Sequence, residues 1–187
     1  PKIHAGILNK RNNFKHKEEL KKNNFENIDL VIVNFYPFEK TIKNSKNHEK
    51  IVENIDVGGP TMVRAAAKNY NDVTVITSID QYDELIKQLN QNNGSTSKQF
   101  RQKMSKEAFA ETAYYDSLIS NYFNKISNDN FPKKKIFGIN LLDKLRYGEN
   151  PHQSSAIYST QNNLNFQQLN GKQLSYNNLN DIFAALT

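Results

Sequence analysis

The sequence contains no cysteine and no tryptophan in its 187 residues. Without cysteine, the chain forms no disulfide, carries out no thiol catalysis and offers no cysteine ligand to zinc. No window approaches about 18 apolar residues, which excludes a membrane-spanning helix. No basic and then apolar leader opens the chain, so nothing in it indicates secretion.

Several motifs with known chemistry are also missing. The four histidines, at positions 4, 16, 48 and 152, do not have the spacing of metal ligands, so we expect no metal site. The chain matches neither the phosphate-binding P-loop pattern nor the dinucleotide pattern GxGxxG. It has no GxSxG elbow, and its serines lack the context of a catalytic triad. Internal repeats are absent too.

The charge and polarity of the chain exclude fewer classes of protein than these absences do. Lys and Arg number 25 against 19 for Asp and Glu, a formal net charge of +6. The lysines are scattered, and their longest run, 133–135, has no aromatic residues between its members that would stack on bases. We therefore favour a solvated basic surface over a nucleic-acid site, since anionic small substrates also account for modest basicity. Only 37% of residues are hydrophobic, but they form dense blocks, so the composition is not that of a disordered chain.

Those blocks predict an α/β fold. Residues 29–37 are apolar without alternation and end at a proline, which indicates a strand buried on both faces. Its polar members, Asn34 and Tyr36, fall at its C-terminal end, where open α/β sheets bind ligands. A tyrosine in that place is more often a packed aromatic residue with a satisfied hydroxyl.

The remaining elements follow from period and turn signals. Ser78 and Gln81 have the spacing of a capping box that opens a helix ending near Asn90. An apolar stripe at helical spacing predicts one long helix, or two in sequence, over residues 98–126. The other expectations are an exposed helix or loop at 15–24, a buried strand at 72–77, a polar domain linker at 127–135, strands at 136–145 and 156–159, and a helix from 180 to 187.

The strongest local signal is the run Asp56-Val57-Gly58-Gly59-Pro60-Thr61 before a helix at 62–68. Glycines that turn into a helix N-terminus present unpaired N–H groups to an anion, although a plain turn between strand and helix fits equally well. Arg64 and Lys68 lie four residues apart on that helix and share a face. They are either two solvated cations or a polar wall of the same cleft.

A second signal is Arg146-Tyr147, a guanidinium and a phenol before a glycine turn. Such a pair suits bidentate binding of a phosphate, but as an isolated dipeptide it is weak. The residues alone therefore predict an α/β domain with a cleft suited to an anion. They do not identify the reaction or the ligand.

Four blocks together resemble a known family, the bifunctional purine-biosynthesis enzymes with AICAR transformylase and IMP cyclohydrolase activities. The blocks are 1–8, 29–39, 54–69 with IDVGGPTMVRAAAKN, and 145–153 with LRYGENPHQ, and residues 171–178 also resemble the family. The resemblance implies a methylglyoxal-synthase-like parallel-sheet domain for the cyclohydrolase over residues 1–132. The linker and the start of a cytidine-deaminase-like α/β transformylase domain would follow over 133–187.

The same resemblance implies site residues. The catalytic residues of the cyclohydrolase would be Tyr36, Asp56 and Lys68. Its nucleotide contacts would be Asn34, Val57, Gly58, Gly59 and Arg64, and the AICAR contacts of the transformylase would be Arg146 and Tyr147. Which of Asp56 and Lys68 acts as the base stays open.

The family also implies ligands and a setting. These are AICAR, formyl-AICAR and IMP, with 10-formyltetrahydrofolate as a co-substrate bound outside these residues and no metal required for cyclisation. We expect a cytoplasmic homodimer as the full-length protein, with no nucleic-acid or membrane partner.

The chain departs from the family at both ends. A Lys-Thr-Leu-His stretch with an active-site lysine precedes the position of Pro1 in the family, and most of the transformylase domain follows position 187. We therefore expect an internal piece of a longer enzyme, inactive alone in both reactions. The alternative is a non-catalytic small-molecule sensor of the same fold, but Tyr36, Asp56 and Lys68 together favour the enzyme.

Overall fold

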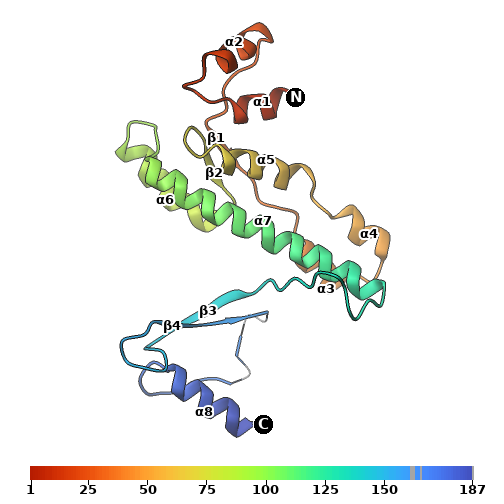
Figure 1. Ribbon diagram of the computed structural model, residues 1–187, viewed down its shortest axis with the longest axis vertical. Coiled ribbons are helices and arrows are strands. Elements are labelled where there is room, and N and C mark those ends of the chain that lie inside the picture. Colours follow the sequence, from red (N-terminus) through yellow and green to blue (C-terminus); the bar gives the residue numbers. More distant parts are fainter. Residues whose placement is uncertain (161–162, 165, 187) are drawn as a thin grey trace. The chain divides into compact units, whose positions relative to one another are not determined.

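The computed structural model describes residues 1–160, 163–164 and 166–186 (Figure 1). The chain divides into two compact units, Pro1–Lys134 and Lys135–Thr187, and the division falls within the polar segment 127–135. Each unit has its own two-stranded sheet.

A parallel strand pair forms the centre of the first unit. Strand β1 (Leu30–Ile32) pairs with β2 (Thr74–Ile76) in the register Leu30 to Thr74, Val31 to Val75 and Ile32 to Ile76. Two further bonds extend the pairing beyond the strands: Val33 N–H donates to the Ile76 carbonyl (3.0 Å) and Thr74 N–H to the Asp29 carbonyl (2.8 Å). Both predicted strands therefore exist, although each is shorter than the apolar run that predicted it.

The prediction that residues 29–37 are buried on both faces is wrong. Val31 is 7% exposed, but its neighbours Leu30 and Ile32 are 38% and 45% exposed. Strand β2 is buried throughout, because helices α5 and α7 both pack against it. In the described residues β1 pairs with β2 alone, so it has an open edge and one covered face. The apolar composition of the run did not reveal that difference.

Helices lie beside this pair (Figure 1). The predicted capping box of Ser78 and Gln81 is confirmed, although it opens a short 3-10 turn, Ile79–Gln81, that leads into α6. Residues 98–126 form one continuous helix, whose N-cap Ser97 accepts a bond from the Phe100 N–H (3.2 Å). The helices of the unit are α1 (Lys2–Leu8), α2 (Phe14–Lys22), α3 (Phe38–Asn44), α4 (His48–Glu53), α5 (Gly58–Lys68), α6 (Tyr82–Gln91) and α7 (Lys98–Ile126).

The core consists of two hydrophobic clusters. In the first, Ala65, Ala66 and Ala67 of α5 let that helix approach β2 and the N-terminal half of α7 closely. In the second, Phe38 and Ile51 pack against Tyr115 in the C-terminal half of α7. Helix α7 is thus shared by both clusters, and Figure 1 shows it running along α5 and on to α3.

The second unit is an antiparallel pair with one helix. Strand β3 (Asn140–Leu145) pairs with β4 (Ser155–Ser159), and helix α8 covers Tyr176–Leu186. The helix begins four residues before the predicted start at 180. Ser175 and Asn178 explain this, because the Ser175 N–H donates to Asn178 Oδ1 (3.1 Å) and the Asn178 N–H donates back to Ser175 Oγ (3.3 Å). The predicted end at Thr187 lies outside the described residues. No described helix combines the length and the apolarity needed to cross a bilayer.

Candidate functional site

A cavity of about 480 Å³ lies where β1 and β2 end. Its walls are residues 34–40 after β1, residues 77–79 after β2, and one face of α7 that carries Glu111, Tyr114 and Tyr115. The C-terminal ends of parallel strands are the usual ligand position in such sheets. Asn34 and Tyr36, the polar residues that the sequence placed at this end, both line the cavity.

Asp56 links the segment after β1 to the start of α5 through hydrogen bonds of its carboxylate. Its Oδ1 accepts the N–H of Gly59 (2.8 Å), and its Oδ2 accepts the N–H of Tyr36 (3.4 Å). Its own N–H donates to the hydroxyl of Tyr115 (2.8 Å). The carboxylate therefore caps α5 while it fixes the backbone at Tyr36, so the structure brings Asp56 and Tyr36 together.

The two glycines of the turn have different surroundings. A Cβ added to Gly59 would lie 2.5 Å from Asp56 Oδ2, whereas a Cβ on Gly58 would meet nothing within 4 Å. Gly59 is therefore required by the close approach of the carboxylate. Its N–H is already bonded to Asp56, so this amide is satisfied within the chain. Binding of a nucleotide by Val57, Gly58 and Gly59 stays a prediction.

Tyr36 and Tyr115 have contrasting environments. Tyr36 is 56% exposed at the cavity, so it is not the packed aromatic residue that was its alternative interpretation. Tyr115 is the packed one, with its ring 5.1 Å from that of Phe35. Burial raises the pKa of the Tyr115 phenol above its ordinary value, although the bond from the Asp56 N–H acts the other way. Burial also raises the pKa of the Glu111 carboxyl on the same helix.

Sequence reasoning did not single out Tyr115 or Glu111. A signal was available for Tyr115, because it lies seven residues after Ala108, on the apolar stripe of the helix. No comparable signal existed for Glu111, since only the packing of α7 beside residues 34–40 shows that it faces a cavity.

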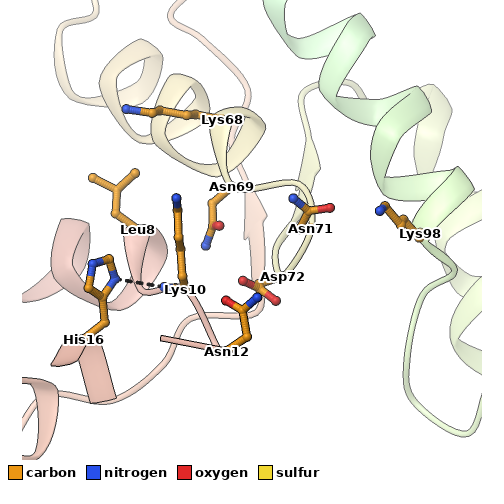
Figure 2. Close-up of a pocket in the computed structure, with 9 residues that line it drawn as sticks. All are labelled: Leu8, Lys10, Asn12, His16, Lys68, Asn69, Asn71, Asp72 and Lys98. Atoms are coloured by element: carbon orange, nitrogen blue, oxygen red, sulfur yellow. Dashed lines mark hydrogen bonds between the residues drawn. The ribbon is translucent and has the colours of Figure 1, made fainter. Parts of the chain in front are cut away.

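Arg64 and Lys68 lie further along α5. The guanidinium of Arg64 is 5.8 Å from the centre of the Phe109 ring. Lys68 ends the helix, roughly 15 Å from Gly58 along the axis. There it lines a different cavity, shown in Figure 2. The structure of this unit therefore does not bring Lys68 into the cavity of Tyr36.

In the second unit, Arg146 and Tyr147 form a pair. The Arg146 guanidinium donates to the Tyr147 hydroxyl (3.1 Å) and lies 4.8 Å from the centre of its ring. A hydrogen bond with Ser175, and then the bond and charge of Arg146, lower the pKa of the Tyr147 phenol. The Tyr147 carbonyl accepts the N–H of Tyr176 (3.0 Å), which ties the pair to the start of α8.

The described residues contain no group of three or more His, Asp or Glu side chains placed to hold a metal ion. Hydrogen-bonding groups, the cation of Arg146 and the carboxylates of Asp56 and Glu111 are among the groups that these sites offer a ligand. Such groups suit acid–base chemistry and the binding of anions.

Comparisons with known proteins agree with this arrangement. The model of the AICARFT/IMPCHase bienzyme family matches residues 66–187, and that of the MGS-like domain matches residues 1–61. These two matches confirm the predicted α/β fold class.

The chain is also similar to three curated proteins, each named bifunctional purine biosynthesis protein PurH. It is 44% identical over 189 residues to that of Bradyrhizobium diazoefficiens, which covers 99% of this chain and 36% of the relative. It is 46% identical to that of Clostridioides difficile, with 100% and 37% covered, and 47% identical to that of Prochlorococcus marinus, with 100% and 36% covered. The chain thus spans little more than a third of the length of these relatives.

Among solved structures, the one titled Crystal structure of ForH superposes with a TM-score of 0.55 at 30% identity, over 65% of this chain and 63% of that one. A family match over most of the chain, with relatives that align over its whole length, confirms the resemblance seen in the sequence blocks. This chain belongs to the AICARFT/IMPCHase bienzyme family.

Proposed function

We propose that this chain is part of a bifunctional enzyme that makes IMP in two steps. In the first step a formyl group passes from 10-formyltetrahydrofolate to AICAR, and in the second formyl-AICAR closes to IMP. The names of the family and of the relatives support this. The observation that carries it is the link of Asp56 to Tyr36 beside the cavity at the strand ends.

Ring closure needs a group that accepts a proton and a hydrogen-bond donor that stabilises the developing oxyanion. The carboxamide nitrogen of formyl-AICAR attacks the formyl carbon, and the formyl oxygen takes up one proton to become a hydroxyl. That hydroxyl leaves as water with a second proton. The carboxamide nitrogen and the formamide nitrogen each supply one of these two protons. Each oxygen of Asp56 accepts one backbone N–H and retains a further lone pair. Asp56 can therefore hold the carboxamide or accept its proton while its own position is fixed.

We assign the phenol of Tyr36 as the hydrogen-bond donor to the developing oxyanion. Its side chain is exposed at the cavity, and its backbone is held by the same carboxylate. Asn34 lies two residues before it in the cavity wall and would contact the nucleotide, together with Val57, Gly58 and Gly59 at the start of α5.

The two cations of α5 contribute differently. Arg64 lies nearer to the turn and would serve as a nucleotide contact. Lys68 lies at the far end of the helix, so within this unit Asp56 is the better candidate for the base. That geometry supports Asp56 as the base, a choice that the sequence left open.

In the second unit, we assign AICAR binding to Arg146 and Tyr147. A guanidinium that already bonds a phenol presents a planar donor set to a phosphate. The pKa of Tyr147 is lowered first by the hydrogen bond with Ser175 and then by the bond and charge of Arg146. The full-length protein would act in the cytoplasm as a homodimer. It would use 10-formyltetrahydrofolate as the co-substrate and no metal in cyclisation.

The test uses a reading frame extended to the length of the relatives. The protein is given formyl-AICAR directly, or AICAR with 10-formyltetrahydrofolate, and IMP is followed by chromatography. Asp56→Asn should stall at formyl-AICAR, whereas Asp83→Asn, an exposed carboxylate on α6, should turn over like the unmodified protein. Undiminished ring closure by Asp56→Asn would remove Asp56 from the site. If folded, unmodified protein made neither product, the role of a phosphorylated-metabolite sensor would replace the enzyme.

A further inference from the structure

A second cavity of the first unit, about 800 Å³ in volume, has a strongly basic lining (Figure 2). Lys10, Lys68, Lys98 and His16 line it together with a single carboxylate, that of Asp72. It shares no lining residue with the cavity at the strand ends. The two cavities lie at opposite ends of α5.

The basic side chains come from three separate segments. Lys10 follows α1, Lys68 ends α5 and Lys98 begins α7. The buried Asn69 holds two of these segments together, because its side-chain amide donates to the carbonyls of Ile7 (2.8 Å) and Asn9 (3.0 Å). In Figure 2 the side chain of Lys10 extends between His16 and Asn69. Three lysines from separate segments therefore line one cavity, and two of these segments are held together by Asn69.

Their charges are not neutralised within the described part of the chain. The ion pairs found there are those of Arg11, Lys43 and Lys103, and none includes a lysine of this cavity. The Asp72 carboxylate is occupied in part, since its Oδ2 accepts the N–H of Arg11 (3.1 Å). Helix α7 has no acidic residue in its first turn, so the charge of Lys98 adds to the positive end of the helix.

His16 adds a further hydrogen-bond donor. Its Nδ1 accepts the backbone N–H of Lys10 (3.2 Å), so the neutral ring carries its proton on Nε2. That nitrogen can donate to a ligand oxygen. Asn12 and Asn71 supply further amide groups for a polar ligand.

From these observations we propose that this cavity binds a phosphorylated small molecule, such as a phosphate monoester or a diphosphate. A cleft lined by charges of one sign concentrates the opposite charge, and lysine ammonium groups bind phosphate as point charges. The volume lies within the range of small-molecule sites, about 300–1,000 Å³. This site goes beyond the proposed function and does not depend on it.

Titration calorimetry of the chain at low salt tests the proposal, with inorganic pyrophosphate and ribose 5-phosphate as the probes. We expect at least one probe to bind with a Kd below about 1 mM. The double variant Lys10→Gln/Lys98→Gln should weaken that binding by about tenfold or more. The matched variant Lys87→Gln/Lys106→Gln, with exposed lysines outside the cavity, should change it by less than about twofold.

Two results overturn the site: no binding of either probe at about 10 mM, or an equal loss of affinity in both double variants, which would indicate a general charge effect. A second measurement needs no variant. In the unmodified chain, pyrophosphate should protect Lys10 and Lys98 from chemical acetylation and leave Lys87 and Lys106 reactive, as read by mass spectrometry. Binding should persist in Asp56→Asn, so failure of ring closure and failure of this site are distinguishable.

Discussion

The two strand pairs of this chain obtain their stability differently. Every residue of β2 is buried, with Ile76 and Val75 at 0% and 1% exposure, whereas β3 has no buried residue. Helices α5 and α7 both pack on β2. In the described part of the second unit the buried residues are only Gly148, Ser175 and Leu179. The parallel pair depends on side-chain packing, and the antiparallel pair depends mainly on its backbone ladder and turns.

Truncating one apolar residue in each pair tests that contrast most strongly. Ile76→Ala should lower the free energy of unfolding of the first unit by about 2–5 kcal/mol, because it removes a fully buried side chain from a closed core. Leu141→Ala in β3, which is 47% exposed, should cost less than about 1 kcal/mol. Denaturant unfolding measures both. Equal losses would mean that the two pairs are packed alike.

Glycines test how closely each turn is packed. Gly59→Ala places a methyl group on the Asp56 carboxylate and should destabilise the first unit by about 1–3 kcal/mol, with ring closure reduced as well. Gly58→Ala has open space and should be neutral or stabilising by up to about 1 kcal/mol. Gly148→Ala sharpens the comparison, since its Cβ would lie 2.9 Å from the Gln153 Cβ in the second unit. Thermal melts of the three variants give the order of their effects on stability.

A smaller effect is expected from one buried hydroxyl. Tyr115→Phe leaves the N–H of Asp56 without its acceptor and should cost about 1–2 kcal/mol. Tyr158→Phe in β4, on a side chain that is 55% exposed, should leave the free energy of unfolding unchanged within about 0.5 kcal/mol. If the two substitutions cost the same in denaturant unfolding, the bond to Asp56 contributes nothing to the fold.

The same structure predicts opposite pH effects in the two units. Burial raises the pKa of Tyr115, so the unfolded state ionises first and the stability of the first unit falls as the pH rises above about 10. The hydrogen bond with Ser175 and the neighbouring Arg146 lower the pKa of Tyr147. The stability that ionisation of Tyr147 contributes to the second unit is therefore complete above about pH 10. It is lost as the pH falls through the lowered pKa of Tyr147. Following phenolate absorbance in Tyr115→Phe and Tyr147→Phe should show the loss of a late and an early titration, respectively.

The elements themselves could largely be predicted from the sequence. The apolar runs before Tyr36 and Thr77, and the capping box at Ser78, are local signals that the structure keeps. The burial of Leu30 and Ile32 was predicted wrongly, because burial depends on which neighbours cover a strand, and an apolar run does not encode them.

The positions of the candidate residues could be predicted where those residues lie next to a strand end in the sequence, although their roles stay a prediction. Asn34, Tyr36 and Asp56 lie at or beside the expected strand ends, and the alternative of a packed Tyr36 is removed by its exposure. Lys68 was grouped with them by resemblance, but a helix of 11 residues separates it from Asp56 in this unit. The partnership of Tyr115 with Asp56 joins residues 59 positions apart, a distance that no local pattern spans.

The length of α7 has a consequence for how the chain is made. This helix of 29 residues comes last among the elements of the first unit, yet it packs against α5, β2 and α3. During synthesis, therefore, both hydrophobic clusters remain uncovered until the ribosome has released residue 126. The first unit would then acquire its final structure late and in one step, and nascent chains that stop before α7 would be natural clients of chaperones.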